Sequence, residues 1–173
     1  VYVSSVVTYK NGYFAHTLTL VEGDNWIRAL CVDLIHDARS NFSHYKHVVV
    51  DTICPKVVYT IPDNGTVIVW HRDIRIKVVF SEALCIDNND TLKYAFGLYM
   101  DNRQIEGTVI VTNHTSTNFT LEFRPERPLV AGERYHVYIR PLLHDCAGNT
   151  IVPYSWSFDV SSQFETFMEN LLF

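Results

Sequence analysis

Short runs in which apolar and polar residues alternate recur along most of this chain. In residues 135–158, Tyr135, Val137 and Ile139 alternate with outward-facing positions before a polar turn that contains Gly148. A second alternating run follows that turn. A period of two residues is typical of strands with one buried face, and glycine can take the positive φ that a tight turn needs. The pattern predicts a hairpin whose apolar side needs a facing sheet.

The same alternation predicts further strands of one β-sandwich over residues 54–160. Ile76 and Val78 alternate with charged residues, and runs rich in Val, Ile, Thr, Tyr and Phe lie between turn-forming clusters. Helical periodicity is nearly absent before residue 160. We therefore expect an all-β unit, with a polar loop at residues 81–92 and a strand at residues 93–100.

Residues 1–53 are expected to form a second, incomplete sandwich ahead of the first. The predicted strands are at residues 1–7, 14–20, 27–33 and 47–52. Four strands are few for an independent sandwich, so we expect the missing strands upstream and the chain to be a piece of a longer protein. Pro55 holds the preceding residue extended and lacks a backbone donor, which is typical of a linker between two sandwiches.

The tail, residues 161–173, changes to a helical period. Ser162 followed by Glu165 is a capping-box pattern. Apolar residues then recur at positions i, i+3, i+4, i+7 and i+8, namely Phe164, Phe167, Met168, Leu171 and Leu172. This pattern predicts a short amphipathic helix with a large apolar face. We expect this face to bind a neighbouring domain or another copy of the protein; a strand that inserts into a neighbour's open sheet is the alternative.

Composition and charge narrow the possible partners. Hydrophobic residues make up 47% of the chain, enough for a real core. The formal net charge of −5 argues against nucleic acid or acidic membranes as the main partner, because binding phosphates needs a basic face. No run approaches the roughly 18 apolar residues of a membrane span.

Acceptor sites for N-linked glycans are unusually frequent. Five of the eleven asparagines stand in Asn-X-Ser/Thr sequences, namely Asn41, Asn64, Asn89, Asn113 and Asn118. All five fall in predicted turns or strand ends, where a glycan could attach. Some matches can also be accidental, because Asn and Thr are common in β-turns. We expect a glycosylated protein that is extracellular or at the cell surface.

A series of short motifs runs through the second module in a fixed order. They are PKVV at 55–58, PDNG at 62–65, IKVVFSE at 76–82, FTLEFRP at 119–125, PLVAGERY at 128–135, DCAGN at 145–149 and WSF at 156–158. With these motifs, residues 55–160 resemble the bacterial Ig-like modules of surface-layer and other exported proteins. Residues 1–53 are similar to another bacterial Ig-like repeat, through LVEGDNWI at 20–27 and VVVDT at 48–52.

The resemblance implies two tandem immunoglobulin-like β-sandwiches in a structural or adhesive surface protein, with no catalytic residues. The chain departs from the family pattern at Ala83-Leu84-Cys85, where a proline and small polar residues are usual, and at an insertion over residues 34–40. These departures concern the loops.

The Ig-like arrangement also implies a disulfide bond. In it, Cys85 ends the second strand and Cys146 the sixth, and these strand ends lie at the same pole of the sandwich. A bridge would close a loop of about 60 residues and contribute about 4 kcal/mol in the chain-entropy model. Two independent thiols are the alternative. Cys54 lies too far along the chain to pair with Cys31, so we expect Cys31 to be a small buried hydrophobe.

Metal-binding patterns are incomplete. The histidines His44, His47 and His144 lack the four convergent ligands of a zinc site. Residues 87–90 resemble a fragment of a calcium loop but lack the glycine and the bidentate glutamate of an EF-hand. We therefore expect no metal or other cofactor, with an irregular calcium site that includes Asp145 or Glu82 as the alternative.

No catalytic motif occurs, so the chain is not expected to be an enzyme. The favoured function is a non-catalytic extracellular structural module of a surface layer, filament or stalk, which mediates assembly. The alternative is an adhesion or carbohydrate-binding module of a larger exported protein. Trp26, Trp70 and Trp156 are interpreted as core or module-interface residues rather than as a sugar-stacking platform.

Overall fold

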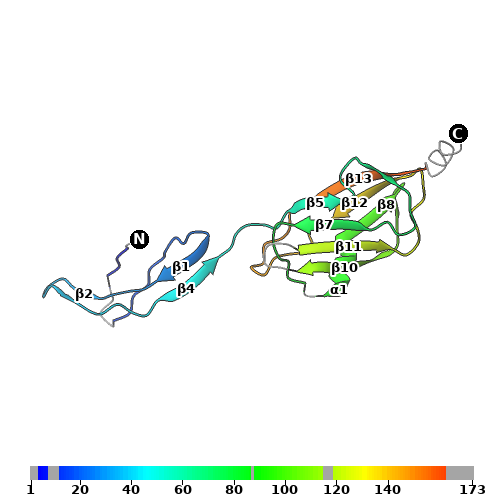
Figure 1. Ribbon diagram of the computed structural model, residues 1–173. Helices are drawn as coiled ribbons and strands as arrows, with labels where there is room; N and C mark the ends of the chain where they lie inside the picture. The colour runs from blue at the N-terminus through cyan, green and yellow to red at the C-terminus, as the bar shows by residue number, and fades with distance from the viewer. Residues whose placement is uncertain (1–3, 8–11, 87, 115–118, 163–173) are drawn as a thin grey trace. The chain divides into compact units, whose positions relative to one another are not determined.

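The computed structural model describes residues 4–7, 12–86, 88–114 and 119–162 (Figure 1). The chain divides into two compact units, residues 1–52 and residues 53–173. Almost all regular structure is β, as the sequence predicts.

Unit 2 is built from two β-sheets that enclose a common core. The four-stranded sheet has the order β10-β11-β7-β5, and the five-stranded sheet has the order β6-β13-β12-β8-β9. The strands are β5 (Val57–Ile61), β6 (Val67–Val69), β7 (Ile76–Phe80), β8 (Phe96–Met100), β9 (Arg103–Gln104), β10 (Gly107–His114), β11 (Phe119–Pro125), β12 (Arg134–Ile139) and β13 (Tyr154–Ser161). β6 pairs with β13 in parallel, and the other pairs of these sheets are antiparallel. The prediction of an all-β sandwich is confirmed for this unit.

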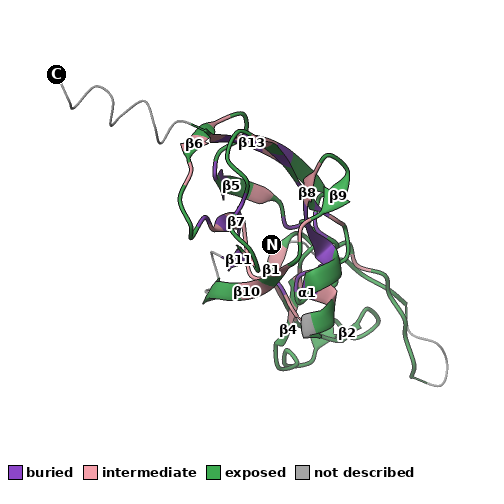
Figure 2. Cartoon of the chain, turned by 90° about the vertical axis from the view of Figure 1, so that its right-hand side faces the viewer, coloured by how far each residue is buried: buried purple, intermediate pink, exposed green. Residues whose placement is uncertain are grey.

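The alternating residues of the sequence form the core between the sheets. Ile76 and Val78 from one sheet and Val137 from the other are fully buried (Figure 2). Phe123 of β11 stacks on Phe96 of β8, with ring centroids 5.3 Å apart, so the two layers are joined by aromatic contact.

Tyr135 anchors the crossing between the sheets. Its ring is buried, and the backbone N–H of Val130 donates a hydrogen bond of 2.7 Å to its hydroxyl. A tyrosine at the start of a strand, bonded to the backbone a few residues upstream, is the tyrosine corner of immunoglobulin-type sandwiches.

One helix, α1 (Asn89–Ala95), differs from the sequence prediction of a loop followed by a strand at residue 93. The Asn88 side chain caps it by accepting a hydrogen bond of 2.8 Å from the N–H of Asp90. Leu92 and Ala95 are buried, which fixes the helix to the core. The prediction was wrong because seven residues are too few to show a helical period.

Unit 1 contains two small antiparallel pairs. β1 (Gly23–Ile27) pairs with β4 (Lys46–Val50), and β2 (Val32–Asp33) pairs with β3 (Ala38–Arg39). Among its described residues no side chain is buried, so they do not form the predicted first sandwich. The strands predicted over residues 4–7 and 14–20 are also not formed. An alternating pattern buries one face only when a second layer covers it, and the described part of unit 1 holds no such layer.

Cys31 is a further correction, because its side chain is exposed rather than buried. The expected alternation from Ile27 to Asp33 fails beyond Ile27, where β1 ends. Without a covering sheet, this short segment has no interior in which a small hydrophobe could lie.

The predicted C-terminal helix lies outside the described residues. β13 ends at Ser161, and residues 163–173 are not described. This segment contains the proposed contact residues Phe164, Phe167, Met168, Leu171 and Leu172. The helix and its apolar face therefore stay predictions.

Candidate functional site

A disulfide bond closes one end of the sandwich in unit 2. Cys85, which follows β7, is bonded to Cys146, which follows β12, and their Cα atoms are 5.1 Å apart. The N–H of Cys85 also donates a hydrogen bond of 2.9 Å to the carbonyl of His144. This is the pairing that the family resemblance implied. The bond ties a loop of the four-stranded sheet to a loop of the five-stranded sheet, so it resists separation of the layers.

The turn beside this disulfide is organised by Asp145, which is buried. Its carboxylate accepts hydrogen bonds of 2.8 Å from the N–H of Ala147 and of 2.9 Å from both the backbone and the side chain of Asn149. Burial opposes the charge, but these hydrogen bonds outweigh it and hold the pKa of Asp145 below its usual value. Asp145 therefore stabilises its own turn by accepting these hydrogen bonds.

The residues considered for calcium are only partly brought together. Glu82 and Asp145 offer carboxylate oxygens within 4.8 Å of one another. Asp90 lies instead in the first turn of α1, and Asp87 is outside the described residues. Calcium binding therefore stays an untested alternative.

Three predicted glycan acceptors are placed at the surface. Asn41, Asn64 and Asn113 are exposed. Asn64 uses its side-chain oxygen to accept a hydrogen bond of 3.1 Å from the N–H of Ser157. Asn89 begins α1, and Asn118 lies outside the described residues. The exposed positions leave room for glycans.

The three tryptophans occupy different environments. Trp156 is buried in the core, and the half-buried Trp70 donates a hydrogen bond of 2.6 Å from its indole N–H to the carbonyl of Leu129. Trp26 is 63% exposed and stacks on the ring of His47 with centroids 4.2 Å apart. The interpretation as a core residue fits Trp156, while Trp26 is a surface residue because no other described part of unit 1 covers the strand pair β1–β4.

A carboxylate that the sequence analysis did not select is the centre of a charged cluster. The side chain of Glu122, on β11, is only 4% exposed and contacts three cations. The distances are 2.7 Å to Nε of Arg124, 3.1 Å to Nη1 of Arg75 and 3.3 Å to Nζ of Lys77. Burial raises the pKa of Glu122, but the hydrogen bonds from these cations dominate and lower it to about 2. The carboxylate is ionised at neutral pH and holds Arg75 and Arg124 in place.

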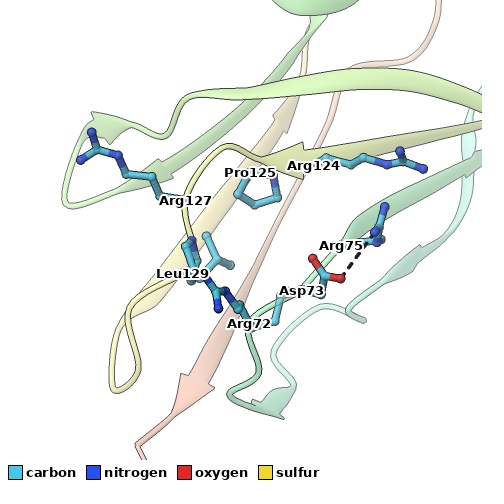
Figure 3. Close-up of a pocket in the computed structure, with 9 residues that line it drawn as sticks. Arg72, Asp73, Arg75, Arg124, Pro125, Arg127 and Leu129 are labelled. Carbon is cyan, nitrogen blue, oxygen red and sulfur yellow. Dashed lines mark ion pairs between the residues drawn. The ribbon is translucent and has the colours of Figure 1, made fainter.

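Next to this cluster lies a pocket of about 240 Å³, which we call the arginine pocket (Figure 3). Its lining includes four arginines, one acid and two buried apolar side chains, namely Arg72, Arg75, Arg124, Arg127, Asp73, Ile74 and Leu129. In Figure 3, Arg75 and Arg124 lie to one side and Arg127 to the other, with Arg72 between them.

The arginine pocket is at the opposite end of the sandwich from the disulfide. It lies where β7 begins and the antiparallel β11 ends, whereas Cys85 follows the other end of β7. Sequence reasoning missed the pocket because Arg72 and Arg127 are far apart in the chain. The cross-strand pair of Glu122 with Lys77 was the available signal, because opposite charges on neighbouring strands face each other.

Comparison with known protein families gives a match for residues 51–160, more than half of the chain, to the bacterial Ig-like domain. The chain belongs to the bacterial Ig-like domain family. This confirms the resemblance drawn from the motifs of residues 55–160.

Three solved structures are similar to this Ig-like chain at low sequence identity, and each match covers 63% of this chain. The S-layer protein rSbsC(31-844) is 19% identical with a TM-score of 0.44, and 14% of that chain is covered. The N-terminal part of the S-layer protein SbsC is 19% identical with a TM-score of 0.43 and 24% coverage. PcoC, a methionine-rich copper resistance protein from Escherichia coli, is 16% identical with a TM-score of 0.47 and is covered completely. Comparison with curated proteins gives no significant match.

The side chains of the arginine pocket in this Ig-like unit suit the binding of a negatively charged group. Guanidinium groups match carboxylates, phosphates and similar oxyanions through paired, charge-assisted hydrogen bonds. The arginine pocket concentrates such groups in a chain whose formal net charge is −5. In the described part of the chain, no helix has the length and apolar character needed to cross a membrane.

Proposed function

We propose that this chain is a non-catalytic structural module of an extracellular surface layer, filament or stalk. The observation that carries the proposal is the Cys85–Cys146 disulfide across a fully packed Ig-like sandwich. Structural disulfides form and persist in oxidising environments outside the cytosol. The five sequons support the same location, because glycans attach to exposed asparagines of exported proteins.

The strand order of unit 2 suits a module placed in series with others. β5 begins beside the end of β7, at the disulfide end, since Val57 faces Phe80. β13 runs from the partner of Ile139 to the partner of Arg134, so it finishes at the opposite end, near the arginine pocket. A chain that joins the sandwich at one end and leaves it at the other transmits load along its length, and the disulfide limits separation of the two sheets.

The proposed partners are neighbouring domains or copies of the same protein, together with N-linked glycans. The net charge of −5 speaks against nucleic acid. The apolar residues of the tail provide the proposed contact with neighbours, because a large apolar face is unstable in water unless it is covered.

The test is self-association of the purified chain with and without residues 163–173. We expect the full chain to form concentration-dependent assemblies in light scattering, and the shortened chain to lose them while its sheet-rich circular dichroism is unchanged. A matched control replaces only the charged Glu165 and Glu169 with glutamine, which leaves the apolar pattern intact. Monodisperse monomers from both the full and the shortened chain would contradict the proposal.

One observation favours an adhesion or carbohydrate-binding module as a second candidate. Trp26 offers an exposed ring, stacked on His47, and Tyr45 packs at its edge with centroids 6.3 Å apart. Exposed aromatic faces of this kind can stack on sugar rings. Trp70 does not serve this role, because its indole is bonded to the backbone of Leu129.

A further inference from the structure

The arginine pocket gathers several positive charges around one hollow. Four arginines line it against one carboxylate, Asp73, whose side chain is 85% exposed. Among the described residues, neither Arg72 nor Arg127 has an ion-pair or hydrogen-bond partner through its side chain. Both side chains are exposed, so their guanidinium groups are accessible to a ligand.

The other two arginines are held in position from behind. Glu122 is buried beneath them and takes only Nε of Arg124 and Nη1 of Arg75, at 2.7 and 3.1 Å. The Nη atoms of Arg124 remain available, and Nη2 of Arg75 lies 3.7 Å from Asp73, beyond a normal hydrogen bond. A buried carboxylate that fixes arginines and leaves their outer N–H groups open is the supporting shell expected of a preformed oxyanion site.

We propose that the arginine pocket binds an oxyanion group, a carboxylate or a sulfate, carried by a sugar of an acidic polysaccharide. The inference goes beyond the structural role and does not rest on it. A hollow of about 240 Å³ is smaller than the sites of drug-sized ligands and suits one sugar with its charged group. The half-buried Pro125 and the exposed Pro128 in the lining offer an apolar surface for the face of the ring.

The net charge of the whole chain favours an acidic polysaccharide over a nucleic acid as the ligand. Duplex DNA carries one negative charge about every 1.7 Å, so binding it requires an extended basic surface. Here four of the fourteen Lys and Arg residues line one pocket of a chain with a net charge of −5, and the net negative charge repels a dense polyanion. A polysaccharide with at most one charge per sugar can place a single charged group in the pocket, with little repulsion between its other charges and the net negative charge of the chain.

The test is calorimetric titration of the full chain with oligogalacturonate and with a sulfated dextran oligomer, at low and at physiological salt. Neutral dextran, inorganic phosphate and a DNA duplex are titrated alongside. We expect binding of one or both acidic oligosaccharides, weakened by salt, and no binding of neutral dextran. Replacing Arg72 and Arg127 with glutamine should weaken this binding about tenfold or more, because each charge-assisted hydrogen bond to an oxyanion contributes at that scale.

The matched control is the double substitution Lys56→Gln and Lys93→Gln. It removes the same charge from two exposed lysines at the disulfide end of the sandwich. We expect this control to bind as the unchanged chain does, which would separate binding in the pocket from a general effect of charge. Melting temperatures of both double variants should match the unchanged chain, because neither pair belongs to the Glu122 cluster.

Four results of the titrations would overturn the proposal. They are no binding of either acidic oligosaccharide, an equal loss in the lysine control, binding of DNA as tight as that of the oligosaccharides, and inorganic phosphate binding with no gain from the attached sugar. If the arginine variant instead loses self-association, the pocket holds an acidic segment of a second copy and the polysaccharide proposal is wrong. Loss of self-association on removing residues 163–173 tests the structural role separately.

Discussion

At the scale of single residues, Glu122 shows how a charged side chain can be buried in a sandwich of this kind. An isolated carboxylate would be unstable in this position, because burial removes its hydration. Three cations on or next to β7 and β11, the two inner strands of the same sheet, surround it, and two of them also line the arginine pocket. The same residue therefore contributes to stability and to the shape of the proposed site.

The pKa of Glu122 gives a prediction with a definite sign. It is lowered from 4.5 to about 2, so the folded state favours the charged form. The resulting stability, about 3 kcal/mol by linkage, is fully present above pH 5 and is lost as the pH falls from about 5 to 2. We expect Glu122→Gln to destabilise the chain in urea unfolding at pH 7, and the difference from the unchanged chain to shrink toward pH 2.

The control for this change is Glu126→Gln, in the exposed segment after β11. It removes the same charge from a position outside the cluster, so its effect should be small at every pH. Equal destabilisation by both substitutions, or a Glu122 effect that does not depend on pH, would contradict the role given to the cluster.

At the scale of elements, the strands of unit 2 could be predicted from the sequence because their two faces differ. Residues such as Val137 and Phe158 face the core, and the polar residues between them face outward. The disulfide was implied by the family resemblance, which places the ends of the strands before Cys85 and Cys146 at the same pole of the sandwich. The strands predicted over residues 4–7 and 14–20 were not formed, because alternation alone does not provide the covering layer that a strand needs.

Two other features could not be predicted from the period of the hydrophobic pattern. Helix α1 is stabilised by its cap and by the burial of Leu92 and Ala95, neither of which shows in a seven-residue pattern. The arginine pocket joins the link before β7 to the link after β11, segments that approach only when the sheet has formed. Sequence alone gave no reason to group Arg72 with Arg127.

The cap of α1 is testable at this scale. Asn88→Ala removes the side chain that accepts from the N–H of Asp90, and we expect a loss of about 1 kcal/mol in the free energy of unfolding. The control Lys93→Ala, at an exposed position in the last turn, should change stability by less than half as much. Unfolding in urea, followed by circular dichroism, measures both. If the two variants lose the same stability, the cap does not fix this helix.

At the scale of the whole molecule, the two units differ in the interactions that stabilise them. Unit 2 has a continuous core, a tyrosine corner and a disulfide, whereas the described residues of unit 1 have no buried side chain. The exposed apolar residues of unit 1, such as Trp26 and Val49, are the kind of surface that another layer covers. This contrast fits a module that is completed by its neighbours in an assembly, as the proposed function requires.

The most direct measurement of the central claim is peptide mass mapping of the protein isolated from its native cells, over the peptides of this sequence, with thiols alkylated before and after reduction. The account predicts that peptides with the exposed acceptors Asn41, Asn64 and Asn113 are heavier than their sequence and lose the excess mass on removal of N-glycans. It also predicts two alkylated cysteines, Cys31 and Cys54, before reduction and four after it. Peptides of unmodified mass at all five sequons, with all four cysteines alkylated before reduction, would contradict a disulfide-bonded, glycosylated module outside the cell.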